Sequence, residues 1–405
     1  MTPLFRKFIG INWILFLIMG GLLAFGVYAI FTATHFREDD DGLGLALKWR
    51  DQLRWIGLGA PIFFAAALMD YKWLRWACLP IYLAGIGGLV YLDMYGVEVK
   101  GNKAWVYIGG MSVQPSQFAI LGGIIMLAVV FGELPRIWPV FRRPWLRILL
   151  AAVVAGIPGA MVIKEDFGSG LVWGPVFLSM MLVGSIPFRY LITLVLGALC
   201  VTPLVYFFVL KDYQQARIDT TWHMLTNQME KVNVRGDGWV PNFVQIAVAS
   251  AGFEGKRAAR QVLGEDAVRT VHTSFFPKTE AHSDFLFGVI SEEFGFRGSV
   301  LLLTSMALLL VWCVFMAFYS RDQMGRLLIV GVVAMFFAHT FQNAGMCVNL
   351  VPVIGLPMPF ISYGGTFMIV TLFLMGMVQS VWVHRNISPL NKKTSGGRSR
   401  RDEED

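Results

Sequence analysis

The stretch FPKTEAHSDFLFGVISEEFGFRGS, residues 276–299, contains the boundary around which this chain is organised. It ends a long polar segment, Lys211 to Ser283, and begins a new hydrophobic run. Asp284 lies at the boundary, two residues after His282. A carboxylate at the mouth of a membrane helix is costly and usually functional, although an aspartate can also simply favour the first turn of a helix. The position alone leaves both interpretations of Asp284 open.

The composition identifies the class of protein. Of the 405 residues, 56% are hydrophobic and only 15% are charged, whereas soluble domains carry about 25% charged residues. The sequence therefore predicts an all-α polytopic membrane protein. The net charge of +7 does not indicate a nucleic-acid partner, because basic residues gather in the cytoplasmic loops of membrane proteins. The four cysteines fall inside apolar runs, and we expect them to pack in the apolar interior.

Hydrophobic runs of the length that a ~30 Å hydrocarbon core requires occur about ten times. The first follows Arg6 and Lys7 and is longer than the core of a signal peptide, which predicts an anchor. We therefore expect about ten transmembrane helices and one large extracytoplasmic loop, about residues 211–283. The predicted spans are residues 14–33, 55–69, 73–95, 115–131, 146–163, 170–186, 190–210, 285–319, 326–348 and 362–383.

The basic residues predict the orientation of these spans. With the amino terminus in the cytoplasm, the inner segments hold more than twice as many Lys and Arg residues as the short outer loops, which is the bias that cytoplasmic loops show. Both termini are therefore predicted to be cytoplasmic, with Asp284 and the large loop outside. Residues 1–390 are predicted to form one transmembrane domain, and residues 391–405 a disordered cytoplasmic tail, because that tail has mixed charge and many Gly and Ser residues.

Four outer-face segments combine polar groups with Gly or Pro, which interrupt membrane helices. Irregular backbone at membrane depth is tolerated only inside protein or against a cavity, so we expect one outer-facing cavity with Asp284 as its best-placed acid. Two alternatives stay open: Trp105 suits an interfacial belt, and the basic cluster at 256–269 can bind phosphate or face solvent. The segments are Gly101–Phe118, Lys164–Leu171, the large loop and Asn343–Thr366.

These segments resemble those of the SEDS family (shape, elongation, division and sporulation), whose members include RodA and FtsW. The resemblance covers roughly residues 10–390, in family order. Ile354 before Gly355 favours the RodA branch, because division-type relatives usually carry Lys there, whereas TEAHSDF is closer to the FtsW branch. The matching motifs are WVYIGGMSVQPSQ at 105–117, KEDFGSGL at 164–171, AHSDFLFGVISEEFGFRG at 281–298 and NAGMCVNLVPVIGLPMPFISYGG at 343–365.

The resemblance implies a peptidoglycan glycosyltransferase that polymerises lipid II into glycan strands during cell elongation and the maintenance of cell shape. It implies a multi-pass location in the bacterial cytoplasmic (inner) membrane. The implied partners are a class B penicillin-binding protein transpeptidase and the elongation machinery, and a divalent metal ion, Mg or Mn, would be compatible with Asp284 as a ligand. Three alternatives stay open: a division-specific FtsW-like polymerase, a flippase or transporter of the lipid-linked precursor, and a non-catalytic scaffold.

The resemblance also implies roles for individual residues. Asp284 matches the essential aspartate of the family, and Asp166 matches the aspartate of its P-D-L-G motif. Arg217 is similar in position to an arginine of the family's large loop. We therefore expect Asp284 to be catalytic and the following residues to bind substrate: Arg217, Asp166, Trp105, His282 and Ser362.

Two positions depart from the family pattern. The family usually has Glu after Q-P-S and Lys three residues later, whereas this chain has Gln117 and Ile120. If that Lys normally neutralises a lipid phosphate, another cation must serve here. Arg217, Lys103 and a bound divalent metal are the candidates.

The chemistry of chain extension suits an aspartate. The 4-hydroxyl of the acceptor sugar attacks the anomeric carbon of the donor, and a lipid diphosphate leaves. A carboxylate that takes the hydroxyl proton typically contributes a ~100- to 10,000-fold effect, and cations stabilise the leaving diphosphate. At 100° per residue, neither Glu292 nor Glu293 faces the same side as Asp284, so we expect structural roles for both.

Overall fold

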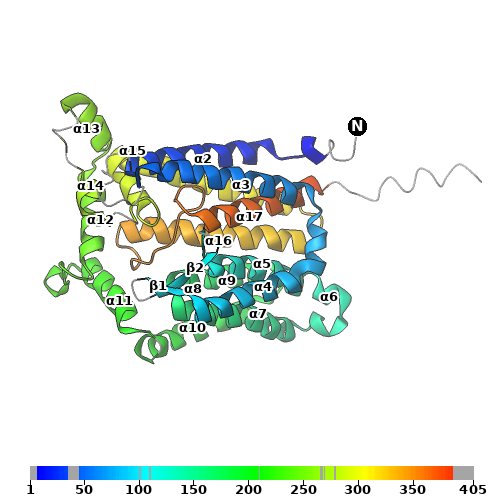
Figure 1. Cartoon of the computed structure of the whole chain (residues 1–405). Coiled ribbons are helices and arrows are strands. Elements are labelled where there is room, and N and C mark those ends of the chain that lie inside the picture. Colours follow the sequence, from blue (N-terminus) through cyan, green and yellow to red (C-terminus); the bar gives the residue numbers. More distant parts are fainter. Residues whose placement is uncertain are drawn as a thin grey trace, which may run out of the picture.

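The computed structural model describes residues 7–34, 45–99, 102–108, 111–208, 210–264, 268, 270–277 and 280–385. The predicted tail, residues 391–405, lies outside these. Most of the described chain is a bundle of long helices that share one direction (Figure 1). The long helices are α2 Trp13–Thr34, α3 Lys48–Leu68, α4 Leu74–Tyr95, α5 Pro115–Gly132, α7 Pro144–Glu165, α10 Phe188–Phe208, α15 Leu286–Phe318, α16 Gln323–Cys347 and α17 Gly365–Val383.

Eight helices in the described part of the chain are long and apolar enough to cross a membrane. They correspond to eight of the predicted spans. The second predicted span is α3, which has 21 residues but begins before residue 55 with the charged sequence KWRDQLR. The sixth is short: α8, Phe167–Leu171, and the 11-residue α9, Trp173–Val183, together form the apolar stretch Phe167–Val183. The class of fold is confirmed, and these two elements are shorter or more polar than the pattern predicted.

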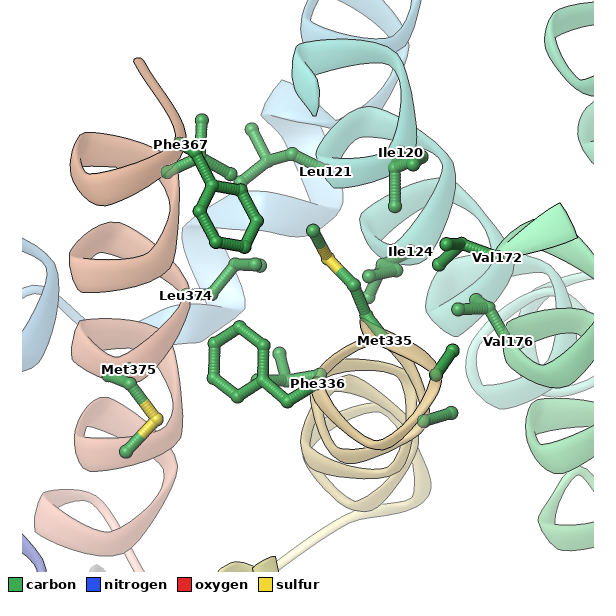
Figure 2. Close-up of a cluster of buried hydrophobic side chains, with 14 of the residues drawn as sticks. Ile120, Leu121, Ile124, Val172, Val176, Met335, Phe336, Phe367, Leu374 and Met375 are labelled. Atoms are coloured by element: carbon green, nitrogen blue, oxygen red, sulfur yellow. The ribbon is translucent and has the colours of Figure 1, made fainter. Parts of the chain in front are cut away.

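The centre of the bundle is formed by α5, α16 and α17. More than 70% of the spanning window of each is buried inside the protein, whereas no residue of α10 is buried. Figure 2 shows side chains of these three helices meeting those of the α8–α9 segment. Gly331 lets α16 approach Ile124 and Met180 closely, which is how small residues promote helix packing in membranes. The labelled core residues are Ile120, Leu121, Ile124, Val172, Val176, Met335, Phe336, Phe367, Leu374 and Met375.

The large loop has its own helical structure. Its helices lie across one end of the bundle, and α2 begins and α17 ends at the opposite end (Figure 1). The two ends of the described chain therefore lie on the side away from the loop, which agrees with the predicted topology. The loop helices are α11 Asp212–Leu225, α12 Trp239–Ser250, α13 Lys256–Leu263 and α14 Val271–Phe275.

A small antiparallel sheet precedes α5, and the sequence analysis did not predict it. Its strands are β1 Val97–Val99, β2 Asn102–Ile108 and β3 Met111–Val113, in the order β1-β2-β3. Val106 pairs with Val113, and Tyr107 with Ser112. The sheet ends at Gln114, and α5 begins at Pro115, a position that proline favours because its missing N–H is not needed there.

Candidate active site

A cavity of about 430 Å³ lies where the loop helices meet the bundle. All four irregular segments predicted from the sequence contribute to its wall, together with the residues around Asp284. The prediction that these segments surround one cavity is therefore confirmed. The cavity also receives Trp55 from α3.

Five of the six predicted site residues line this cavity. Trp105 comes from β2, Arg217 from α11, and Asp166 from the break before α8, while His282 and Asp284 precede α15. Ser362 does not line the cavity. Its buried hydroxyl accepts a bond from the Met358 backbone N–H at 2.9 Å, so it shapes the loop that forms one wall.

Asp284 is half-buried, and the backbone around it is held by α16 and by the loop between α16 and α17. The Asn343 side chain donates to the Asp284 carbonyl oxygen at 2.8 Å, and the Tyr363 backbone N–H donates to the His282 carbonyl at 3.0 Å. Gly355 lies so close to the Asp284 carboxylate that any side chain there would collide with it. Asp284 thus projects from a constrained backbone into the cavity.

Asp166 has a different environment. Its carboxylate accepts bonds from the Ser169 backbone N–H at 3.2 Å, the Ser169 hydroxyl at 2.6 Å and the Gln114 amide at 3.1 Å. Burial raises the pKa of Asp166 above its ordinary value, against the opposing effect of these bonds. Because its oxygens already have donors, Asp166 is better placed to shape the cavity than to take a proton.

Arg217 is the only Lys or Arg among the described residues that line the cavity. Its guanidinium lies 5.6 Å from the ring of Tyr213, one turn earlier on α11. Lys103, the other candidate cation, does not line the cavity; its ammonium lies 3.5 Å from the Asp93 carbonyl. Gln117 and Ile120, where the chain departs from the family, are completely buried in α5. Of the two side-chain candidates, only Arg217 is placed to meet a ligand in the cavity.

The acids after Asp284 bind the large loop. Glu292 is completely buried and accepts bonds from Lys256 at 2.5 Å, the backbone N–H groups of Val271 and His272, and the His272 ring. Arg260 pairs with Glu293. The structural roles expected for both glutamates agree with these contacts. Lys256 and Arg260 are thus mostly buried in ion pairs, so a merely solvated face is wrong for these two residues, and phosphate binding by the basic cluster stays a prediction.

The backbone of the loop also joins α15 at this point. Gly295 interrupts α15 with φ 67° and ψ −165°, a conformation that only glycine adopts readily. The backbone N–H groups of Phe296 and Arg297 donate to the carbonyls of Gly252 and Phe253 at 3.0 and 3.1 Å. The loop is thus bonded to the membrane helix that follows Asp284.

Several cavity residues were missed by sequence analysis. Tyr213 and Gln214 line the cavity with the predicted Arg217, because they precede it on α11 by four and three residues and so share its face. Glu280 lies four residues before Asp284, and Tyr363 lies in the family motif at residues 343–365. The spacing in α11 was the available signal, but it is useful only once Arg217 is assigned to a helix.

Comparison with known proteins agrees with this arrangement. The model of the FtsW/RodA/SpoVE family, described as cell cycle protein, matches residues 12–387. The chain belongs to this family. The family expected from the motifs is therefore confirmed over nearly the whole length.

Individual relatives come from both branches. The chain is 28% identical over 381 residues to the "Probable peptidoglycan glycosyltransferase FtsW" of Synechocystis, covering 92% of this chain and 90% of the relative. It is 27% identical over 308 residues to the peptidoglycan glycosyltransferase MrdB of Escherichia coli, covering 76% and 78% of the two chains.

Solved structures share the fold. A chain from a peptidoglycan synthase complex superposes with a TM-score of 0.72 at 24% identity, covering 93% of this chain and 99% of that chain. The rod shape determining protein RodA of Thermus thermophilus superposes with a TM-score of 0.63 at 24% identity, covering 93% and 98%.

Proposed function

We propose that this protein is a peptidoglycan glycosyltransferase that polymerises lipid II, the polyprenyl diphosphate-linked disaccharide peptide. The observation on which this proposal rests is that Asp284 and Arg217 line the same cavity at the junction of the loop and the bundle. The names of relatives such as FtsW of Synechocystis and MrdB of Escherichia coli support this assignment.

The cavity residues divide the chemistry between them. Asp284 takes the proton of the acceptor 4-hydroxyl as that oxygen attacks the anomeric carbon, and the donor's bond to the lipid diphosphate breaks. Arg217 stabilises the charge that develops on the diphosphate, since guanidinium groups bind phosphate through two parallel hydrogen bonds. Trp105 and His282 supply an aromatic face and a polar edge for the sugars. Asp284 thus receives the proton, and Arg217 stabilises the leaving diphosphate.

An adjoining apolar groove provides for the polyprenyl chain. It has a volume of about 490 Å³ and lies between α4, α5 and the sheet. Side chains alternate along β3 and the residue that follows it: Ser112 and Gln114 line the cavity, whereas Val113 lines the groove. In β2, Trp105 likewise lines the cavity, whereas Val106 lines the groove. The polar head of a lipid-linked sugar can therefore occupy the cavity while its apolar chain extends into the groove.

A divalent metal ion, Mg or Mn, is a compatible cofactor. Among the described residues, no three His, Cys, Asp or Glu side chains form a group that could hold a metal by itself. Magnesium, however, is often held by one or two carboxylates together with substrate phosphates. Asp284 with Glu280 or Asp166 is the carboxylate set that lines the cavity, and the metal would neutralise diphosphate charge.

The elongation role is favoured by Ile354 before Gly355, and the division role by the TEAHSDF stretch. We assign the RodA-like role in elongation and cell shape, with a class B penicillin-binding transpeptidase and the elongation machinery as partners. A solved structural neighbour belongs to a peptidoglycan synthase complex that coordinates polymerisation and crosslinking, which supports such a pairing. Loss of rod shape on depletion would support elongation, and filamentation would support division.

The location follows from the same assignment. We infer that the protein spans the cytoplasmic (inner) membrane with both termini in the cytoplasm and residues 211–283 outside. Single cysteines at Asp237, which is exposed in the loop, and at Ser399, outside the described residues, test this. An outside-only reagent should modify position 237 alone; modification of position 399 instead would reverse the orientation.

Purified protein supplied with lipid II, with and without its transpeptidase, tests the activity itself. We expect glycan polymer. A flippase or transporter would form none, and a scaffold would form polymer only through another enzyme in the mixture, independently of Asp284.

A further inference from the structure

Two buried polar side chains of α16 hold the loop that borders Asp284. Asn343 and His339 lie one turn apart, and both are completely buried. The Asn343 amide donates to two carbonyl oxygens, of Asp284 at 2.8 Å and of Leu356 at 2.6 Å. The His339 Nδ1 lies 3.0 Å from the Pro357 carbonyl oxygen. Because a carbonyl only accepts, Nδ1 carries the proton there.

The two Asn343 bonds join both sides of the carboxylate. One reaches the backbone of Asp284 itself. The other reaches Leu356, whose neighbour Gly355 lies so close to the Asp284 carboxylate that the carboxylate would have to move to make room for a Cβ atom there. The Asn343 amide therefore positions both the backbone that carries the Asp284 side chain and the backbone at Leu356, next to Gly355.

We propose that Asn343 is a positioning residue for the transfer step, acting through the Asp284 and Leu356 backbones; this inference rests on the proposed function. The side chain at position 343 must supply two hydrogen-bond donors from one small planar group, because both of its partners are carbonyl oxygens. Asn supplies them, Asp supplies at most one when protonated, and Leu supplies none. Without the amide, Asp284 and Gly355 move apart, and a displacement of about 1 Å can lower a rate by about 100-fold.

The test compares Asn343→Leu and Asn343→Asp with Thr340→Val. Thr340 is a matched control because it lies on the same helix, is buried, and its hydroxyl has no hydrogen-bond partner among the described residues. Purified variants at matched folded fraction are assayed for lipid II polymerisation. Both Asn343 variants should lose ~10- to 100-fold in kcat with KM for lipid II nearly unchanged, whereas Thr340→Val should match wild type.

A second readout does not depend on activity. Hydrogen exchange of the backbone amides in residues 352–364 should be faster in Asn343→Leu than in Thr340→Val, because the Leu356 anchor is gone. Unchanged exchange, or a kcat within about threefold of wild type, would overturn the positioning role. A wild type that forms no polymer would overturn the proposed function instead, and the exchange measurement would still decide whether Asn343 anchors the loop.

Discussion

Asp284 and Glu292 lie eight residues apart on the same stretch of chain, yet their surroundings are opposite. Glu292 is completely buried and receives Lys256, His272 and two backbone N–H groups. Asp284 is half-buried and faces a cavity of about 430 Å³ that also holds Asp166 and Glu280. The difference teaches that a buried acid paired with cations and backbone donors holds structure, whereas an acid that lines a cavity has space beside it for a ligand.

The two regions also differ in the number of Lys and Arg side chains that accompany their carboxylates. In the Glu292–Glu293 network each carboxylate has its own Lys or Arg from α13. In the described wall of the cavity, one arginine, Arg217, accompanies three carboxylates. A bound diphosphate would add further negative charge, so in the proposed mechanism Arg217 and any metal ion would supply the electrostatic stabilisation there. The two regions should therefore respond differently to the loss of one group.

The largest effect is expected for Glu292→Ala. Removing one partner of a buried ion pair leaves uncompensated charge and typically costs ~3–5 kcal/mol, so we expect lower thermal stability, release of the large loop and loss of polymerisation together. Limited proteolysis of the loop and thermal unfolding measure this. Asp51→Asn is the control, because the Asp51–Arg54 pair is more exposed and such pairs contribute about 0–1 kcal/mol. Equal stability of the two variants would remove the structural role of Glu292.

Arg217→Ala is expected to act on activity alone. Loss of a preorganised donor to developing charge typically lowers kcat by ~100- to 1000-fold, while the partly exposed position of Arg217 on α11 predicts little change in stability. Arg217→Lys should recover only part of the rate, because Lys cannot bind phosphate through two parallel bonds. Polymerisation rates are compared with those of Arg235→Ala, an exposed arginine outside the cavity. Similar rates for both alanine variants would remove Arg217 from the mechanism.

Asp166→Asn should have the smallest effect on rate, less than about tenfold, because Asn keeps most of the hydrogen bonds that hold α8. Its effect on stability should depend on pH. Burial raises the pKa of Asp166, so the folded state binds more protons than the unfolded state above the ordinary value of ~3.9, and this contribution falls as pH rises. The melting temperature of the variant minus that of wild type should therefore increase as the pH rises above about 4. A difference that decreases with pH would contradict the environment described for Asp166.

The sequence was informative where one local pattern determined the outcome. Apolar runs predicted the membrane helices, and the Gly- and Pro-rich segments at 164–171 and 343–366 predicted a cavity, because irregular backbone cannot face lipid. The position of Asp284 at the start of an apolar run marked it as the best-placed acid. These conclusions required no knowledge of which segments meet.

Contacts between distant segments were not accessible in the same way. From the sequence alone, Lys256 and Arg260 were equally compatible with a phosphate site and with a solvated face. The glutamates that they contact lie more than 30 residues further along the chain. The short strands β1–β3 gave too few residues for a clear alternation. Gly168 of α8 lies against Ile354, a contact with a segment nearly 190 residues further along the chain.

The central claim is that Asp284 performs the proton transfer in lipid II polymerisation. Purified wild type and Asp284→Asn should be compared at matched protein levels, with thermal stability measured alongside. Asn preserves the size of the side chain and caps helices about as well, but it cannot accept the proton at neutral pH. We predict unchanged stability and a loss of at least ~100-fold in polymer formation. Near-normal polymer from a folded Asp284→Asn protein would contradict the account and redirect the search to Asp166 and Glu280.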